Sequence, residues 1–158
     1  MNTERVNRIL ASMKEKNVPQ LIVTDPMMLF YVLGKEFSSG ERMQALLLRA
    51  DGEHVFFLND LYPEDQTLGV KMVQYNDVDD AVALLCKYLV KGEAIAVDKN
   101  WAARFVLHLQ ELCNVRLGEL PLFPFLTDPV IVLHSANLLV FKRERVISWD
   151  DPEDFPNC

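Results

Sequence analysis

The sequence is poor in the residues that build metal sites, disulfide frameworks and phosphate-binding loops. Its 158 residues include three cysteines, three histidines and six glycines. The cysteines, Cys86, Cys113 and Cys158, are odd in number and form no CxxC pair. They indicate a reducing compartment and neither a zinc site nor a disulfide framework. The scattered glycines form no GxGxxG or GxxxxGK[ST] motif, which argues against a phosphate cradle.

No assembled catalytic site can be read from the sequence. A metal centre needs several His, Asp or Glu ligands that converge on one point, and His54, His108 and His134 lie far apart in the chain. We interpret His108, on an expected apolar helical face, as a core or interface residue with a local hydrogen bond. The serines at 38–39 lack the GxSxG elbow of a nucleophilic serine.

Long hydrophobic runs and a basic surplus are also missing. No stretch approaches the roughly 18 to 20 apolar residues that span a bilayer, and the N-terminal sequence MNTERVNRIL mixes charges into its first turns, unlike a secretory signal. The 16 Lys and Arg against 23 Asp and Glu give a net charge of −7, the opposite of a nucleic-acid-binding footprint. We therefore expect a cytoplasmic protein with neither nucleic acid nor membrane as a partner.

What is present is enough for one folded domain. Half of the residues are apolar, and the length matches one domain of about 150 residues. The Asp51-Gly52 step between two apolar runs is a hairpin signal. Apolar periodicity and end signals predict helices at 3–16, 26–33, 78–92 and 100–112, a helical turn at 60–67, and strands at 20–24, 45–49, 54–58, 71–75, 94–97 and 115–117.

This order of elements predicts the fold class. Strands that alternate with helices imply a sheet covered by helices on both faces, and the hairpin makes the sheet mixed. We therefore expect a three-layer α/β fold with a mixed, mostly parallel sheet and one β-hairpin. After residue 118 the character changes: prolines interrupt the chain, residues 130–140 are apolar without a clean period, and the end, WDDPEDFPNC, is acidic. We expect this part to be loosely ordered.

A set of short motifs follows in a distinctive order. They are an apolar strand ending in Thr24-Asp25-Pro26, a Tyr31-x-x-Gly34 step, Gly40-Glu41-Arg42 before the ALLL strand, the Asp51-Gly52 hairpin, and Ala96-Val97-Asp98 before the last helix. In order and spacing these motifs resemble the N-terminal domain of the creatinase, prolidase and aminopeptidase P family. The resemblance covers residues 4 to about 131.

The resemblance implies a missing partner domain. In the family, a larger C-terminal domain of pita-bread fold binds two divalent metals, typically Mn, Co or Zn, through Asp, His and Glu ligands. It hydrolyses the bond before a proline, or creatine in the creatinases. No metal ligand of the family maps onto this sequence. We therefore expect a family-like domain at 1–131, a divergent tail at 132–158, no catalytic domain, no cofactor in this chain and no hydrolysis by it alone.

The resemblance also implies a role. In relatives the N-terminal domain builds a homodimer or tetramer and walls the entrance to the active site. By similarity of position, the loop from Phe37 to Arg42 is expected to form this wall for a short proline-containing peptide. Arg42 would pair with a substrate carboxylate, an exposed Phe37 would pack against a substrate side chain, and Tyr31 beside the loop is a further candidate.

Two other functions stay open. One is a stand-alone module that self-associates through an exposed apolar surface, over which residues 130–141 would alternatively fold back. The other is a small-molecule-binding α/β domain with its site at the carboxyl ends of the strands.

Overall fold

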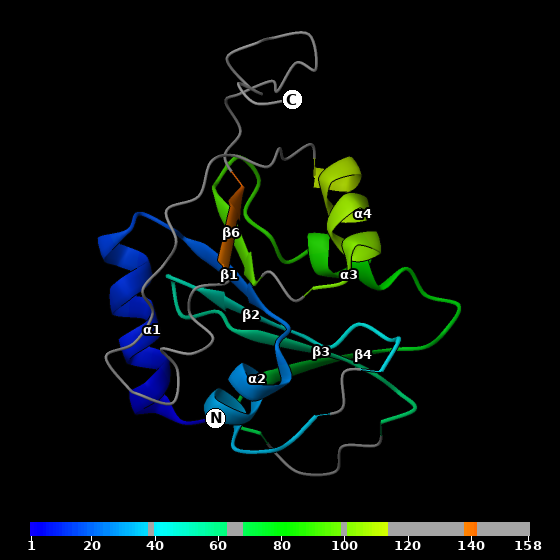
Figure 1. Cartoon of the computed structure of the whole chain (residues 1–158), viewed down its shortest axis with the longest axis horizontal. Helices are drawn as coiled ribbons and strands as arrows, with labels where there is room; N and C mark the ends of the chain where they lie inside the picture. The colour runs from blue at the N-terminus through cyan, green and yellow to red at the C-terminus, as the bar shows by residue number, and fades with distance from the viewer. Residues whose placement is uncertain (38–39, 63–67, 99–100, 114–137, 142–158) are drawn as a thin grey trace, which may run out of the picture.

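A mixed β-sheet runs through the centre of the protein (Figure 1). The computed structural model describes residues 1–37, 40–62, 68–98, 101–113 and 138–141. Within these residues the sheet has six strands in the order β4-β3-β2-β1-β5-β6. The strands are β1 (Gln20–Val23), β2 (Ala45–Arg49), β3 (Val55–Asn59), β4 (Lys71–Tyr75), β5 (Ile95–Asp98) and β6 (Leu138–Phe141).

The pairing of these strands confirms a mixed sheet with a central hairpin. Strand β1 is parallel to β5, and β3 is parallel to β4. The pairs β1–β2, β2–β3 and β5–β6 are antiparallel. Parallel pairing is thus less frequent than expected, because the β2–β3 hairpin lies in the middle of the sheet and returns beside β1. At its turn Gly52 has a φ of 90°, a left-handed conformation that favours glycine.

Helices cover both faces of the sheet, as the three-layer prediction requires (Figure 1). Helices α1 (Thr3–Glu15) and α2 (Pro26–Leu33) share one apolar cluster with Leu46, Leu48 and Phe56. Helices α3 (Ala81–Cys86) and α4 (Ala103–Cys113) share the other with Leu47 and Phe57. Neighbouring residues of β2 and β3 therefore point to opposite cores, since successive strand side chains alternate between faces.

The first two helices begin and end where their sequence signals predict. Asn2 caps α1 by accepting a hydrogen bond from the backbone N–H of Arg5. Asp25 caps α2, Pro26 occupies its first turn, and Gly34 ends it with a φ of 77°. The Asn2 and Asp25 side chains and the backbone N–H of Gly34 satisfy helix-end groups that would otherwise lack a partner. None of the helices in the described ranges combines the length and the apolar character of a membrane span.

The predictions for the third and fourth helices need correction. Helix α3 starts only at Ala81, where Asp80 caps it, so Val78 lies in the preceding turn and is 92% exposed. Helix α4 starts at Ala103, after the buried Trp101, and it buries Val106 and Leu109. The apolar spacing in the sequence was misleading because turns before both helices interrupt the period of 3.6 residues.

The sixth strand was not predicted. Residues 138–141 pair antiparallel with β5, although the apolar run that contains them has no strand-like period. Part of the expected helical turn at 60–67, the strand predicted at 115–117 and the acidic end of the chain lie outside the described residues.

Candidate functional site

Polar side chains gather at one edge of the sheet, where both parallel strand pairs end. Strands β1 and β5 end there. Thr24 and Asp25 directly follow β1, and Asp98 is the last residue of β5. Strands β3 and β4 end at the same edge, and residues 42–44 enter β2 beside them. We call this side the carboxyl edge. Open α/β sheets commonly bind ligands at this position.

A buried carboxylate ties part of the carboxyl edge together. The hydroxyl of Thr24 donates to Asp98 at 2.8 Å, and the backbone N–H of Asp25 donates to Asp98 Oδ2 at 3.0 Å. The Thr24 backbone N–H also donates to Asp98. Burial raises the pKa of Asp98 above its usual value. Because Asp25 in turn caps α2, this network holds the β5 end, the β1 end and α2 in one arrangement.

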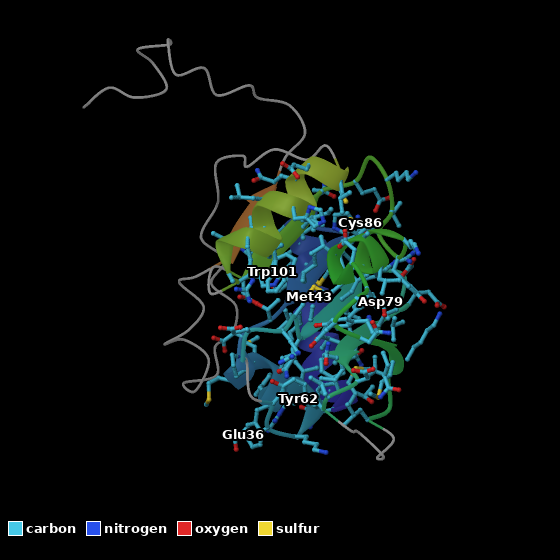
Figure 2. All side chains as sticks on the ribbon, turned by 90° about the vertical axis from the view of Figure 1, so that its right-hand side faces the viewer. Glu36, Met43, Tyr62, Asp79, Cys86 and Trp101 are labelled. Carbon is cyan, nitrogen blue, oxygen red and sulfur yellow. The ribbon has the colours of Figure 1, made fainter. Side chains whose placement is uncertain are left out.

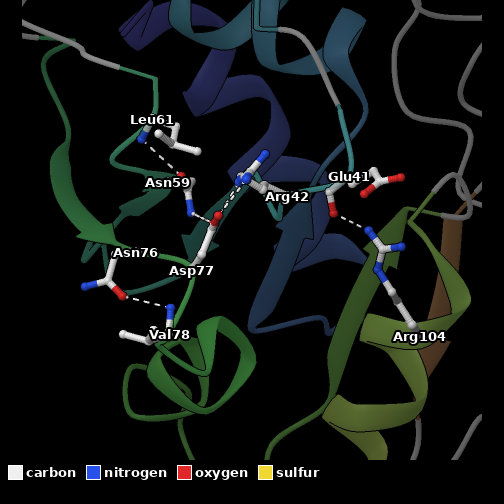
Figure 3. A network of polar contacts seen from close by, with 8 residues as sticks. All are labelled: Glu41, Arg42, Asn59, Leu61, Asn76, Asp77, Val78 and Arg104. Atoms are coloured by element: carbon white, nitrogen blue, oxygen red, sulfur yellow. Dashed lines mark hydrogen bonds and ion pairs between the residues drawn. The ribbon is translucent and has the colours of Figure 1, made fainter.

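An ion pair occupies the other half of the carboxyl edge (Figure 3). The guanidinium of Arg42 donates from Nε to Asp77 Oδ1 at 2.7 Å and from Nη2 to Oδ2 at 2.6 Å. The buried Asn59 supports the carboxylate with a hydrogen bond from Nδ2 at 3.0 Å. Hydrogen bonding to Arg42 lowers the pKa of Asp77. Arg42 thus presents two parallel donors in the geometry that recognises a carboxylate.

A cleft of about 470 Å³ opens beside this ion pair. Tyr75 lies in its wall and donates from its hydroxyl to the backbone carbonyl of Met43 at 2.7 Å, and burial raises its pKa to about 12. On the opposite wall, His108 Nε2 lies 2.8 Å from Asp80 Oδ2. This hydrogen bond raises the pKa of His108. His108 is half-exposed between α3 and α4, so the expectation of a core residue is wrong, and its hydrogen bond joins a residue 28 positions away instead of a local partner.

A smaller cavity of about 150 Å³ adjoins the cleft and contains unpartnered polar groups. Gln44 is 4% exposed and Trp101 is 7% exposed, and both line this cavity. Among the described residues, neither the amide oxygen and nitrogen of Gln44 nor Trp101 Nε1 has a hydrogen-bond partner. Figure 2 labels Trp101 and the neighbouring Met43. Each of these atoms has almost no accessible surface, and unpaired buried polar groups cost stability.

The structure separates the three residues predicted from the sequence. Arg42 lies at the carboxyl edge, in the cleft. Phe37 is buried at 6% exposure and packs edge-to-face on Phe56, with ring centroids 4.9 Å apart, so its expected exposure is wrong. Tyr31 is also buried, under the guanidinium of Arg5. Both aromatic rings belong to the core beneath α1 and α2, because burying a large apolar side chain is favourable.

The residues of the cleft that sequence reasoning missed are those paired across long sequence distances. Asp77 and Asp80 line the cleft, and Asn59 supports Asp77 with a hydrogen bond; none of the three was predicted as a site residue. Asp77 lies 35 residues from Arg42, and Asp80 lies 28 residues from His108. The only local signal was the position of Asn59 and Asp77 directly at or after strand ends, where binding residues often collect.

The described side chains at the carboxyl edge include groups that can bind carboxylates and other small polar groups. No group of three or more His, Cys, Asp or Glu in the described ranges is placed to hold a metal ion. Arg42 with Asp77, and the unpartnered Gln44 with Trp101, are instead groups that bind carboxylates and other small polar groups. A larger groove of about 640 Å³ lies at the opposite edge, beside the end of α1, and is lined mainly by apolar side chains with few charges.

Comparisons with known proteins agree with this fold. No curated protein sequence matches the chain. A proline dipeptidase from Streptococcus agalactiae superimposes with a TM-score of 0.64 at 17% identity, covering 72% of this chain and 89% of that chain. The N-terminal domain of an Xaa-Pro dipeptidase from Lactobacillus brevis gives 0.61 at 18% identity, covering 83% and 97%.

One of the similar structures belongs to a longer chain. Dipeptidase PepE from Mycobacterium ulcerans superimposes with a TM-score of 0.62 at 26% identity. The match covers 81% of this chain and 34% of that one. The sequence profile of the Creatinase/Prolidase N-terminal domain matches residues 5–121, most of the chain. With the sheet order, the covering helices and the predicted motifs all in agreement, this chain belongs to the creatinase/prolidase N-terminal domain family.

Proposed function

We propose that this chain acts as the N-terminal domain of an Xaa-Pro dipeptidase-like metallohydrolase. In this role it self-associates and forms one wall of the entrance to an active site. A separate catalytic domain carries out the hydrolysis. The observation that carries the proposal is the family match over residues 5–121, together with the similarity to dipeptidase domains. Two divalent metals, Mn, Co or Zn, would be bound by the catalytic domain and would activate water for hydrolysis.

Arg42 is the residue we place at the substrate. It is partly exposed at the mouth of the cleft and already binds a carboxylate, that of Asp77, through two donors. A substrate carboxylate would either take the place of the Asp77 carboxylate or bind the Arg42 guanidinium together with it, so the guanidinium would stay paired. Phe37 and Tyr31 are buried, so they would support the loop from beneath rather than touch the substrate.

The test of this role joins the chain to a catalytic domain of the family. We expect Arg42→Ala to lower kcat/KM for an Xaa-Pro dipeptide by at least about tenfold, because a lost charge-assisted pair weakens binding and positioning. Arg8→Ala is the matched control, since Arg8 pairs with Glu4 on the exposed face of α1, away from the cleft. If Arg42→Ala stays within about twofold of the parent, the carboxylate role is wrong.

The purified chain without a catalytic domain provides a second test. Given Mn²⁺ or Co²⁺ and an Xaa-Pro dipeptide, it should release no proline. Metal-dependent release of proline, abolished by a chelator, would contradict the proposal that the catalysis belongs to another domain.

The self-association half of the proposal rests on exposed apolar side chains of α2. Met27 and Phe30 are one turn apart on this helix and both are exposed, with Phe30 at 48%. A second copy of the chain would cover them. We expect a concentration-dependent dimer in sedimentation velocity that Phe30→Glu converts to monomer. Leu107→Glu is the matched control, because Leu107 is 60% exposed on α4. A monomer at every concentration would contradict self-association.

The unpartnered groups at Gln44 and Trp101 favour a second candidate function, the binding of a small polar molecule. A primary amide or a carboxylate would accept hydrogen bonds from Trp101 Nε1 and the Gln44 amide nitrogen. We expect acetamide or acetate at high concentration to raise the thermal unfolding midpoint of the chain, as ligands of the folded state do. Gln44→Leu should remove this rise. An equal rise in both proteins would indicate a general solvent effect and no site.

A further inference from the structure

Two cysteines that are distant in the sequence meet between α3 and α4. Cys86 is the last residue of α3 and Cys113 the last residue of α4. Their sulfur atoms lie 2.7 Å apart, and both thiols are free and half-buried. Figure 2 labels Cys86 at the end of α3. A disulfide has sulfur atoms about 2.05 Å apart, so the thiols sit within a small displacement of bonding distance.

We propose that Cys86 and Cys113 are a modification site at which small disulfides, such as glutathione disulfide, introduce an intramolecular disulfide bond. The packing of the two helices supports this inference. Leu85, next to Cys86, and Leu109, one turn before Cys113, are both fully buried in the same apolar cluster. The two helix ends are therefore held together by the core whether or not the sulfurs are bonded.

The oxidation proceeds by two thiol–disulfide exchanges. The Cys113 thiolate attacks one sulfur of glutathione disulfide, which forms a mixed disulfide and releases one glutathione thiolate. Cys86 then loses its proton and attacks the Cys113 sulfur, which forms the internal bond and releases the second glutathione. Two protein thiols are oxidised, and one glutathione disulfide is reduced to two glutathiones. Burial raises the pKa of Cys86, which favours Cys113 as the first attacking group.

The bond would fasten a part of the fold that carries the cleft. The two cysteines are 27 residues apart, and the closed loop contains all of β5. Asp80 caps α3 and His108 lies on α4, and their hydrogen bond spans the same helix pair. Oxidation would therefore restrain α3 and α4 relative to each other, and with them Asp80 and His108 in the wall of the cleft. By the loop-closure argument, it should raise the thermal unfolding midpoint by roughly 10 °C.

The experiment uses the full chain with Cys158→Ser, which leaves only the two cysteines in question. The protein is equilibrated in glutathione buffers from fully reduced to fully oxidised, quenched with acid and weighed intact. We expect a loss of two hydrogen atoms, no bound glutathione, and a cross-linked Cys86–Cys113 peptide after non-reducing digestion. The unfolding midpoint should rise with the oxidised fraction and fall again after reduction.

The single variants Cys86→Ser and Cys113→Ser in the same background are the controls. Each should carry a glutathione adduct or a free thiol and should show no oxidation-dependent rise in its unfolding midpoint. Two free thiols or a stable glutathione adduct in the parent with both cysteines would overturn the proposal. If the Cys158→Ser background does not fold, the same peptide map on the unsubstituted chain decides. There, a pairing with Cys158 instead of Cys86–Cys113 would overturn it.

Discussion

Two buried glutamines, at opposite edges of the sheet, show how differently the two edges are built. Gln20 begins β1 and is 1% exposed, and its amide forms two hydrogen bonds with Val90, one to the carbonyl at 3.1 Å and one from the N–H at 2.6 Å. Gln44 precedes β2 and is equally buried, yet its amide has no partner among the described residues.

The difference indicates where stability has been given up. A buried amide without partners destabilises the folded state, whereas a fully bonded one contributes to it. At the edge near Gln20, the backbone of Val90 satisfies the side-chain amide. The edge at Gln44 is the carboxyl edge, which also holds Arg42 and the two cavities. Unpaired buried polar groups beside a cavity, like those of Gln44 and Trp101, are typical of binding sites, where function outweighs stability.

The largest expected effect on the free energy of unfolding comes from Asp98, whose hydrogen bonds hold one half of the carboxyl edge together. Asp98→Ala would leave the backbone N–H groups of Thr24 and Asp25 without their acceptor. We expect a loss of about 3 kcal/mol in the free energy of unfolding, measured with a chemical denaturant. Asp98→Asn keeps one acceptor oxygen and should lose less. A loss below about 1 kcal/mol for the alanine variant would show that this network is not what holds β1 to β5.

The next effect tests the edge at Gln20, where β1 begins. Gln20→Ala removes both hydrogen bonds to Val90. It leaves the Val90 N–H without its acceptor and the Val90 carbonyl with only the long bond of 3.5 Å from the Glu93 N–H. We expect a loss of about 2 kcal/mol in the free energy of unfolding. Gln20→Glu is a useful companion, because it keeps the shape but loses the donor to the Val90 carbonyl, and it should also destabilise the protein.

The matching change at the carboxyl edge should not lower the free energy of unfolding. Gln44→Leu replaces an unpartnered amide by an apolar side chain of similar size. We expect the free energy of unfolding to stay the same or to rise by up to about 1 kcal/mol. A loss as large as that of Gln20→Ala would contradict the comparison, since it would mean that the Gln44 amide is paired in solution.

The smallest effects are pH-dependent and separate the two aspartates of the carboxyl edge. Burial raises the pKa of Asp98, so the folded state binds its proton more tightly than the unfolded state. Its contribution to stability is fully present below its unfolded pKa, 3.8, and is lost as the pH rises through the folded pKa. Asp77 behaves in reverse, because Arg42 lowers its pKa: its contribution is present above 3.8 and is lost as the pH falls through the lowered value.

Thermal unfolding between acidic and neutral pH measures this contrast. The midpoint difference between the parent and Asp98→Asn should grow as the pH falls. The difference for Asp77→Asn should shrink over the same range and should not exceed about 3 °C, because exposed ion pairs contribute little. Two variants with the same pH trend would contradict the opposite pKa shifts assigned to Asp98, from burial, and to Asp77, from Arg42.

Local signals predicted most of the secondary structure. The caps Asn2 and Asp25, the closing Gly34 and the Asp51-Gly52 turn act through groups within about four residues, so the sequence shows them directly. The family resemblance followed from the same ordered signals, and the profile match confirmed it. Where a turn interrupted the apolar period, as before α3, the prediction of helix length was wrong.

The candidate site depended on contacts that no local signal shows. Arg42 was predicted as a binding residue, but its pairing with Asp77 across 35 residues came only from the structure. The exposure of Phe37 was mispredicted because its ring packs against Phe56 in the core on the α1 and α2 side of the sheet. The approach of Cys86 to Cys113 has the same origin, since it needs two helices to pack on one face.

The amino-acid order by itself determined most of the elements, the caps of α1 and α2, the hairpin and the family. These depend on backbone hydrogen bonds and apolar periods that involve near neighbours in the chain. Only the tertiary structure decided which charges pair, which aromatic rings are buried and which polar groups stay without partners at the carboxyl edge. Those outcomes depend on how two layers of helices close over the sheet, and that packing brings together residues that the sequence keeps dozens of positions apart.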